Sequence, residues 1–350
     1  MTQRNRILAG VLAVQLIIAA VVFVPRVLPT QSAAAPLLGT LQATDVTGLT
    51  IQEQGGQPIS LAKKNGTWVL PAADDFAASP DKITAFVEKL IGLKTDPLVT
   101  RTANSHARLQ VAQAAYVRQV DLTLADGSVK TLYLGSASGG ATHVRVNGQD
   151  EVYLARGLNS FEASTAVAGW IDAAYVSVPQ DKILSATIEN AQGKFEFTQG
   201  AANQWTLKGL TADQTFNPDS AVTLLARLSS ITMVKPLGKT AKPEYGLDKP
   251  TATVTVILSD TASTKVSTLK IGTKDADGNY PVISSDSTYY VSVAGFNVDG
   301  YVTAKLDTFL VAAAPTPIAA PTLEPVTSTA PVTTTEPVSA TVPITPTAAP

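Results

Sequence analysis

Residues 67–92 read TWVLPAADDFAASPDKITAFVEKLIG, and residues 204–229 read QWTLKGLTADQTFNPDSAVTLLARLS. Both stretches begin with a short strand pattern that contains a tryptophan. Both then reach a helix-start signal, in which Ser79 or Asn217 stands at the N-cap position and Pro follows at the first helical position. Each stretch therefore predicts a strand followed by a helix that packs on a sheet.

The two stretches belong to an internal repeat. Trp68 and Trp205 are 137 residues apart, and further landmarks keep this offset to within one residue. They are Ser79–Asp81 with Asn217–Asp219, Leu134–Gly135 with Ile271–Gly272, and Val152–Leu154 with Tyr289–Val291. A constant offset over several landmarks indicates a duplicated structural unit. The equivalent positions of the two tryptophans favour core anchors over ligand platforms.

Short alternating segments surround the helix in each repeat. They lie at 49–52, 59–61, 67–70, 117–124, 130–134, 143–146 and 152–154 in the first repeat, and at 186–189, 194–198, 204–207, 253–258, 266–271, 280–283 and 289–293 in the second. Alternation between tight turns is typical of antiparallel strands. Because strands and helices do not alternate regularly, we predict an α+β fold, mostly antiparallel, in two tandem copies with one packed helix each.

We expect five segments along the chain. They are a cytoplasmic stub and transmembrane signal anchor at 1–27, a linker at 28–40, the first repeat at 41–177, the second repeat at 178–311, and a tail at 312–350. Residues 315–350 hold nine prolines, ten threonines and no aromatic residue. Such a composition buries too little apolar surface to offset the entropy of ordering, so the tail is predicted to be disordered.

The N-terminus carries an apolar run from Ile7 to Val24 behind Arg4 and Arg6. A helix of this length rises about 27 Å, close to the roughly 30 Å hydrocarbon core of a bilayer. The basic flank places the N-terminus inside the cell and the bulk of the chain outside. We therefore expect a single-pass protein of the bacterial cytoplasmic membrane, with the lipid bilayer as the partner of residues 7–24. A signal peptide cleaved near Ala33–Ala35 is the alternative.

The composition argues against several classes of function. Cysteine is absent, which removes disulfides, thiolate nucleophiles and cysteine-based metal sites. The two histidines, His106 and His143, stand far apart in the sequence and are expected to be ordinary surface or strand residues. The formal net charge of −2 does not suit a nucleic-acid binder, which needs a basic field. We therefore predict no metal, no cofactor and no nucleic-acid partner.

One segment of the second repeat, EYGLDKP at Glu244–Pro250, leads into the strand pattern TATVTVIL. It follows the tryptophan strand and the Pro-Asp helix, and it precedes LKIG at 269–272. This order resembles the bacterial family known as domain of unknown function 4340, well over residues 183–310 and more loosely over 42–175. The resemblance implies an envelope-associated protein, encoded in some members beside gliding-motility-type ABC-transporter components. It implies no catalytic residues.

The motif residues are Tyr245, Gly246, Leu247, Asp248 and Pro250. Gly246 permits a sharp turn, Leu247 is expected to fill a core position, and Pro250 keeps the preceding residue extended at the entry to a strand. At an offset of 138 only the leucine recurs in the first repeat, as Leu109. We therefore interpret the motif as structural. A binding role for Tyr245 and Asp248 is the alternative.

Three other patterns resemble functional motifs but have simpler structural interpretations. Ser79-x-x-Lys82 matches one element of penicillin-interacting serine enzymes, but the partner motifs are missing and Ser79 stands at a helix start. The run DADGN at 275–279 lacks the glycine and glutamate spacing of a calcium loop, so a hairpin turn is expected. The run GSASGG at 135–140 lacks the spacing of a phosphate loop and is expected to be a flexible hairpin connection.

These observations favour a membrane-anchored, extracytoplasmic binding or scaffolding protein of the cell envelope and not an enzyme. An accessory role beside an ABC-type export or motility system, with an envelope protein as partner, follows from the family resemblance alone. Two alternatives stay open: a carboxylate-dependent envelope hydrolase, and a glycan or solute receptor with a pocket between the repeats.

Overall fold

The computed structural model describes residues 10, 12–15, 18, 34–200, 204–259 and 264–312. The expected tail therefore lies almost wholly outside the described residues. Of the apolar run at 7–24, only residues 10, 12–15 and 18 are described, and these are helical. Within the described part of the chain, no helix is both long enough and apolar enough to cross a membrane.

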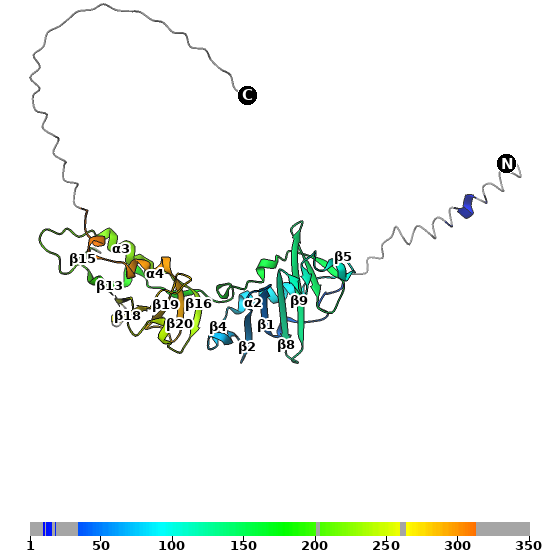
Figure 1. The fold of residues 1–350 in the computed structure, drawn as a ribbon, viewed down its shortest axis with the longest axis horizontal. Helices are drawn as coiled ribbons and strands as arrows, with labels where there is room; N and C mark the ends of the chain where they lie inside the picture. Colours follow the sequence, from blue (N-terminus) through cyan, green and yellow to red (C-terminus); the bar gives the residue numbers. More distant parts are fainter. Residues whose placement is uncertain are drawn as a thin grey trace, which may run out of the picture. The chain divides into compact units, whose positions relative to one another are not determined.

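The N-terminal half of the described chain forms a nine-stranded antiparallel sheet (Figure 1). In spatial order its strands are β4 (Phe76–Ala77), β3 (Thr67–Leu70), β2 (Ile59–Lys64), β1 (Val46–Glu53), β8 (Arg118–Leu124), β9 (Val129–Ser138), β10 (Ala141–Val146), β11 (Val152–Arg156) and β5 (Leu98–Thr100). A separate short hairpin is formed by β6 (Val111–Ala112) and β7 (Ala115–Tyr116). We call the nine strands the N-terminal sheet.

The C-terminal half forms a second nine-stranded antiparallel sheet, the C-terminal sheet. Its order is β15 (Trp205–Leu207), β14 (Gly193–Gln199), β13 (Ile183–Asn190), β17 (Ala252–Ser259), β18 (Thr264–Ile271), β19 (Asn279–Ser284), β20 (Tyr290–Ala294), β16 (Ile231–Gly238) and β12 (Ala174–Val176). Eight strands follow the same order in both sheets, from β3 to β5 and from β15 to β16. The prediction of a mostly antiparallel, β-rich α+β fold is confirmed.

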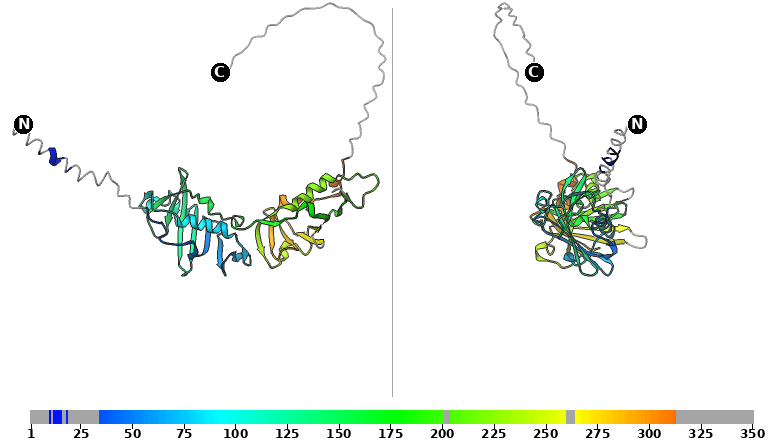
Figure 2. Two further views of the ribbon diagram at one scale, coloured as in Figure 1. Left: turned by 180° about the vertical axis from the view of Figure 1, so that it is seen from behind. Right: turned by 90° about the vertical axis from the view of Figure 1, so that its right-hand side faces the viewer.

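Each sheet carries helices on one face (Figures 1 and 2). Helix α2 (Pro80–Ile91) buries Ile83, Phe86, Val87 and Leu90, the residues that its spacing predicted. Helix α3 (Pro218–Ala226) buries Leu224 and Leu225 in the C-terminal sheet. A further helix, α4 (Gly295–Val302), was not predicted, because its two glycines and weak apolar periodicity give little helix signal.

The landmark residues of the helix starts behave in two ways. The side chain of Asn217 accepts a hydrogen bond from the Asp219 N–H at 3.2 Å, as an N-cap should. Ser79 occupies the N-cap position of α2, but its side chain makes no capping hydrogen bond. Trp68 and Trp205 are buried in the core, which confirms their interpretation as core anchors.

Two strands at or near a sheet edge, β5 and β16, were not predicted from the sequence. Strand β5 follows Pro97 and spans three partly exposed or exposed residues, and β16 contains Pro236. Strand β5 is a short edge strand that buries none of its residues, whereas the alternation of β16 breaks between the buried residues Met233 and Pro236. Both strands lie beyond the last strand of the following meander, β11 or β20. This edge position determines where the chain must pass next.

The segment between the sheets divides near Asp172. On its N-terminal side, Trp170 packs edge-on against Phe86 with ring centroids 5.2 Å apart. On its C-terminal side, β12 pairs with β16. The Tyr175 hydroxyl donates to the Tyr289 carbonyl at 2.8 Å and accepts from the Ser284 N–H at 2.9 Å. Residues 174–176 therefore belong to the C-terminal sheet, although they precede the expected boundary at 177/178.

This junction gives a prediction for fragments of the C-terminal half. A fragment of residues 172–312 should melt cooperatively. A fragment of residues 178–312 should melt at a lower temperature, because it lacks β12 and the two Tyr175 hydrogen bonds, each of which contributes about 1 kcal/mol. Circular dichroism melts of both fragments check this. Equal melting temperatures would show that β12 adds nothing to the C-terminal sheet.

Candidate functional site

The motif EYGLDKP lies in a connection that crosses one face of the C-terminal sheet. Strand β16 lies near one edge of the sheet, whereas the next strand, β17, lies in the centre beside β13. Residues 239–251 must therefore pass over β20, β19 and β18. In the N-terminal sheet, residues 101–117 make the same passage from β5 to β8. We call residues 101–117 and 239–251 the crossing segments.

The crossing segments lie on the sheet face opposite to the helices. Successive side chains of a strand point to opposite faces. On β18, Leu269 and Ile271 belong to the main core with the helices, whereas Lys270 between them faces the crossing segment. On β9, Leu132 and Leu134 lie in the main core, whereas Tyr133 belongs to a separate cluster with residues of the crossing segment.

In the C-terminal sheet, the crossing segment contacts the end of β18 through its backbone. The Tyr245 carbonyl accepts a hydrogen bond from the Thr273 N–H at 3.0 Å. Directly beside it, a Cβ atom on Gly272 would lie 1.9 Å from the same carbonyl oxygen. Gly246 follows in the left-handed conformation, with φ of 65°, and its own Cβ would lie 2.2 Å from the Thr273 hydroxyl oxygen. Only glycine allows this approach.

The N-terminal sheet makes the same contact with different side chains. The Leu109 carbonyl accepts from the Ser136 N–H at 3.1 Å, and a Cβ on Gly135 would lie 2.2 Å from that carbonyl oxygen. Gln110 then adopts the left-handed conformation, with φ of 57°. Gly135 was predicted to lie in a flexible connection, but it lies inside β9, and the turn is made by Gly139 and Gly140.

This contact matches the residues of the two crossing segments at a different offset from the one expected from the sequence. Tyr245 corresponds to Leu109 and Gly246 to Gln110, an offset of 136 in place of 138. Tyr245 is buried, with 6% of its surface exposed, whereas Leu247 is only partly buried. Tyr245 therefore takes the core position that was expected for Leu247. A two-residue shift is invisible in sequence because the contact is made by main-chain atoms.

An apolar cluster fills the space beneath the crossing segment of the N-terminal sheet. It comprises Leu109, Val111, Tyr116, Tyr133 and Val152, and the β6–β7 hairpin supplies part of it. The rings of Tyr116 and Tyr133 lie 5.7 Å apart. This face is therefore closed by a small core of its own.

Arg145 locks this closed face in place. Its side chain is buried and lies over the Tyr133 ring, 4.7 Å from the ring centre. It donates one hydrogen bond from Nε to the Val111 carbonyl at 2.7 Å and another from Nη1 to the Gln149 carbonyl at 3.0 Å. Burial lowers the pKa of Arg145 and raises the pKa of Tyr133, since each charged form loses water. The guanidinium thus joins the crossing segment to the β10–β11 turn.

The crossing segment of the C-terminal sheet leaves a cavity of about 290 Å³ instead, which we call the crossing pocket. It is lined by Ala241, Lys242, Pro243, Tyr245, Leu247, Asp248, Lys270, Ile283 and Tyr290. The Tyr245 and Tyr290 rings form an aromatic wall with centroids 5.7 Å apart, and Lys242 Nζ lies 5.9 Å from the Tyr245 ring centre. Two ammonium groups and one carboxylate therefore border an aromatic wall.

The remaining motif residues are placed as follows. Asp248 is exposed in a turn at the rim of the crossing pocket, and its carboxylate makes no hydrogen bond or ion pair with the described residues. Pro250 stands two residues before β17. The Tyr245 hydroxyl donates to the Leu237 carbonyl at 3.3 Å, so it is engaged within the fold. The motif thus brings Tyr245, Leu247 and Asp248 to one pocket, while Gly246 and Pro250 shape the backbone.

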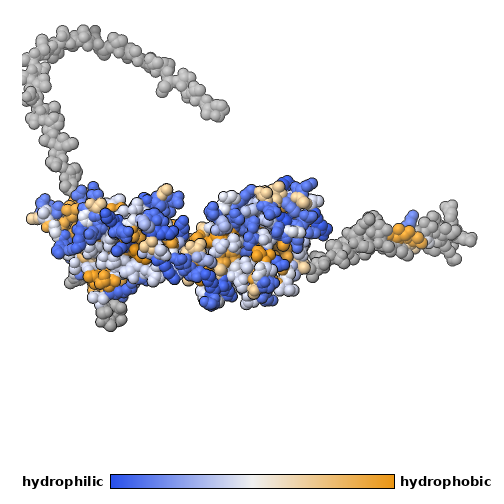
Figure 3. Space-filling model, turned by 60° about the horizontal axis from the view of Figure 1, so that its bottom comes forward, coloured by the Kyte–Doolittle hydropathy of each residue, from blue (hydrophilic) through white to orange (hydrophobic). Residues whose placement is uncertain are grey.

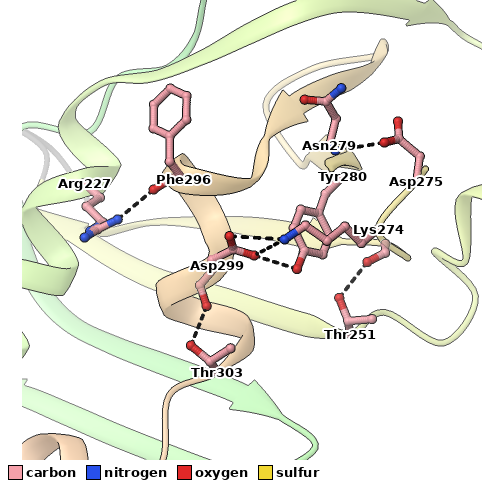
Figure 4. A network of polar contacts seen from close by, with 10 residues as sticks. Arg227, Thr251, Lys274, Asp275, Asn279, Tyr280, Phe296, Asp299 and Thr303 are labelled. Carbon is pink, nitrogen blue, oxygen red and sulfur yellow. Dashed lines mark hydrogen bonds and ion pairs between the residues drawn. The ribbon is translucent and has the colours of Figure 1, made fainter. Parts of the chain in front are cut away.

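A second polar group in the C-terminal sheet joins α4 to β19 (Figure 4). The Asp299 carboxylate accepts from Lys274 Nζ at 3.1 Å and from the Tyr280 hydroxyl at 2.7 Å. Burial, together with the bond to Asp299, raises the pKa of Tyr280 to about 12. The hydrogen bonds from Tyr280 and Lys274 hold the pKa of Asp299 below its usual value. A carboxylate held in this way is a structural ion and not a free general base.

The DADGN run beside this network is a hairpin turn, as predicted. The Asp275 carboxylate accepts from the N–H groups of Asp277 and Asn279 at 3.0 and 2.8 Å. These bonds stabilise the turn between β18 and β19. Among the described residues, no group of three or more metal-ligating side chains comes together.

The two histidines and the Ser79–Lys82 pair take part in the fold. His143 lies in strand β10, as predicted, whereas His106 is buried outside the strands, contrary to the prediction. Their ring nitrogens bond to the carbonyls of Ser136 and Asp150 at 2.7 and 2.9 Å. Lys82 Nζ donates to the Ile171 carbonyl at 2.7 Å. These side chains therefore serve packing and hydrogen bonding between segments.

Exposed apolar side chains are scattered over the described surface. The face drawn in Figure 3 is mostly hydrophilic, with separate hydrophobic patches. Phe161 and Phe296 are the most exposed large apolar residues, at 68% and 72% of their surface. Single exposed apolar residues are normal for a folded protein and do not by themselves mark a site.

The comparisons with known proteins give one match. A family model described as Domain of unknown function (DUF4340) matches residues 68–250, which is just over half of the chain. The matched range runs from Trp68 to the end of the EYGLDKP motif, and so includes the first crossing segment and all but the last residue of the second. No curated protein and no solved structure matches the chain.

The close approach of the crossing segments is tested by adding one methyl group. Gly272→Ala should lower the free energy of unfolding by about 3 kcal/mol or more, because the new Cβ overlaps a backbone carbonyl that cannot move alone. Gly135→Ala should behave alike. Gly127→Ala is the control, because it has open space and costs only about 1–2 kcal/mol for its left-handed backbone. Urea titrations measure all three, and a Gly272→Ala protein as stable as the control would refute the contact.

Proposed function

The chain belongs to the family described as Domain of unknown function (DUF4340), and on this premise we propose that it is a membrane-anchored, extracytoplasmic binding or scaffolding protein of the cell envelope. In this proposal residues 7–24 hold the chain in the cytoplasmic membrane, and the two sheets lie outside the cell. The Pro/Thr-rich residues 312–350 form a solvated tail.

The two sheets are, in our proposal, tandem copies of one unit. The shared order of eight strands supports this. The recurrence of the backbone contact at Gly135 and Gly272 supports it independently, because the contact persists while the side chains around it change. Duplication of a unit extends the surface that is available for partners, as in other repeat proteins.

The observation that carries the binding function is the contrast between the two crossing segments. One copy closes its face with an apolar cluster and a buried arginine. The other leaves the crossing pocket, bordered by Lys242, Lys270 and Asp248 and walled by tyrosine rings. An aromatic wall with convergent charged groups is typical of a recognition site. We therefore place the binding site for an envelope partner at the crossing pocket.

The arrangement of acids favours binding over hydrolysis. A carboxylate-dependent hydrolase needs a second acid or a base close to the first. Asp248 is the acidic residue that lines the crossing pocket, and its neighbours there are lysines and tyrosines. Asp299 is held by Lys274 and Tyr280. The family resemblance implies a component of an ABC-type export or motility system as the partner, and an accessory role for this chain.

The proposed location is tested by protease digestion of spheroplasts. Protease added outside intact spheroplasts should degrade the region of residues 34–312, while a cytoplasmic marker protein survives. The protein should stay with the membrane fraction after a high-salt wash. Survival of the sheet region until the cells are lysed would overturn the extracytoplasmic assignment.

A further inference from the structure

A second charged cavity lies in the N-terminal sheet, far along the chain from the crossing pocket. It has a volume of about 520 Å³, and its lining includes Lys89, Leu93, Lys94, Asp96, Leu154 and Arg156. These residues come from the C-terminal turn of α2, the approach to β5 and the end of β11. We call it the basic pocket.

The basic pocket has more positive than negative charge. Lys89 pairs with Glu162 and is thereby neutralised. Lys94 and Arg156 are exposed and have no ion pair within the described residues, and Asp96 is the acid in the lining. An arginine fork beside a lysine ammonium is the combination that recognises phosphate oxygens, through bidentate and point-charge contacts respectively.

The frame that carries these charges is well ordered by the fold. The Leu154 N–H donates to the Pro97 carbonyl at 3.0 Å, which joins β11 to the approach of β5. Arg156 pairs with Ala141 across the β10–β11 ladder. Leu93 and Ala155 are buried and form an apolar base. Arg156 thus projects from a strand, and Lys94 projects from a segment that an isolated bridge joins to Pro36.

The basic pocket lies where the chain enters the fold from its N-terminal side. The Leu37 N–H donates to the Leu93 carbonyl at 2.8 Å, and the Thr95 N–H donates to the Ala35 carbonyl at 2.9 Å. Residues 25–34 separate Ala35 from the apolar run. Ten residues span at most about 36 Å, so an anchored chain keeps Ala35, and the basic pocket beside it, within that distance of the bilayer.

We propose that the basic pocket binds a phosphate ester through Lys94 and Arg156, and that the ester is the headgroup of an anionic phospholipid in the membrane that holds residues 7–24. The inference rests on the proposed membrane anchoring. Binding of such a headgroup orients the N-terminal sheet against the membrane surface, since it adds a second attachment point to the anchor. A soluble phosphate ester offers the same chemistry and is separated from the lipid by the test.

The test uses the full chain in a neutral maltoside detergent and calorimetric titration. The probes are dioctanoyl phosphatidylglycerol, dioctanoyl phosphatidylcholine and glycerol phosphate. The expected result is saturable binding of phosphatidylglycerol, at least about tenfold tighter than that of the other two probes. Lys94→Gln/Arg156→Gln should weaken it by about tenfold or more, because charge-assisted hydrogen bonds are lost. The matched control, Lys130→Gln/Lys249→Gln, removes the same charge from exposed positions outside the pocket and should leave binding unchanged.

Several outcomes would overturn the proposal. Equal weakening by the control variant would show a general charge effect, and absence of phosphatidylglycerol binding would refute the site. Binding of glycerol phosphate as tight as that of the lipid would assign the pocket to a soluble ester. Melting temperatures of both variants confirm that they fold. Carbonate extraction of membranes tests the anchor separately, so a released protein that still binds phosphatidylglycerol refutes the anchoring alone.

Discussion

In both sheets, a backbone carbonyl oxygen lies where any residue other than glycine would place its Cβ. The Tyr245 and Leu109 carbonyls occupy these positions above Gly272 and Gly135. The contact is needed because β5 and β16 lie near a sheet edge, while the next strand lies in the centre. The chain must therefore cross a sheet face, where each buried N–H and C=O needs a partner. The hydrogen bonds to Ser136 and Thr273 supply it.

From this constraint follow the two different surfaces of the protein. A crossing segment fixed at one glycine can either pack down on the sheet or stand away from it beyond that point. In the N-terminal sheet the β6–β7 hairpin, Tyr133 and Arg145 close the face. In the C-terminal sheet the shorter segment leaves the crossing pocket, with Lys270 at the position of Tyr133. One framework thus carries a closed face and an open one, which is how we account for a crossing pocket in only one of the two described sheets.

Sequence reasoning recovered those features that side-chain patterns encode. The apolar stripe of α2, the two core tryptophans and the DADGN turn follow from spacing and turn chemistry. Features that depend on the backbone were missed. Gly135 in β9 was predicted to form a flexible connection, although it marks the place where the crossing-segment backbone approaches the strand. Leu247 was predicted to be the core residue, although Tyr245 takes that position. Short edge strands such as β5 and unpredicted α4 carry too little periodicity to be found. The crossing pocket and the basic pocket combine residues from distant segments of the chain, so no local sequence motif predicts them.

The most direct test of the central contact is native-state hydrogen exchange at the Ser136 and Thr273 amides. Both N–H groups donate to crossing-segment carbonyls. We therefore predict that they exchange as slowly as the amides of Val120 and Val254 in the central strands, because exchange then requires global unfolding. The exposed turn amides of Gly55 and Gly209, which donate no hydrogen bond to the described residues, should exchange far faster. Fast exchange of Ser136 and Thr273, at rates like those of the turns, would show that the crossing segments open freely and would contradict the account.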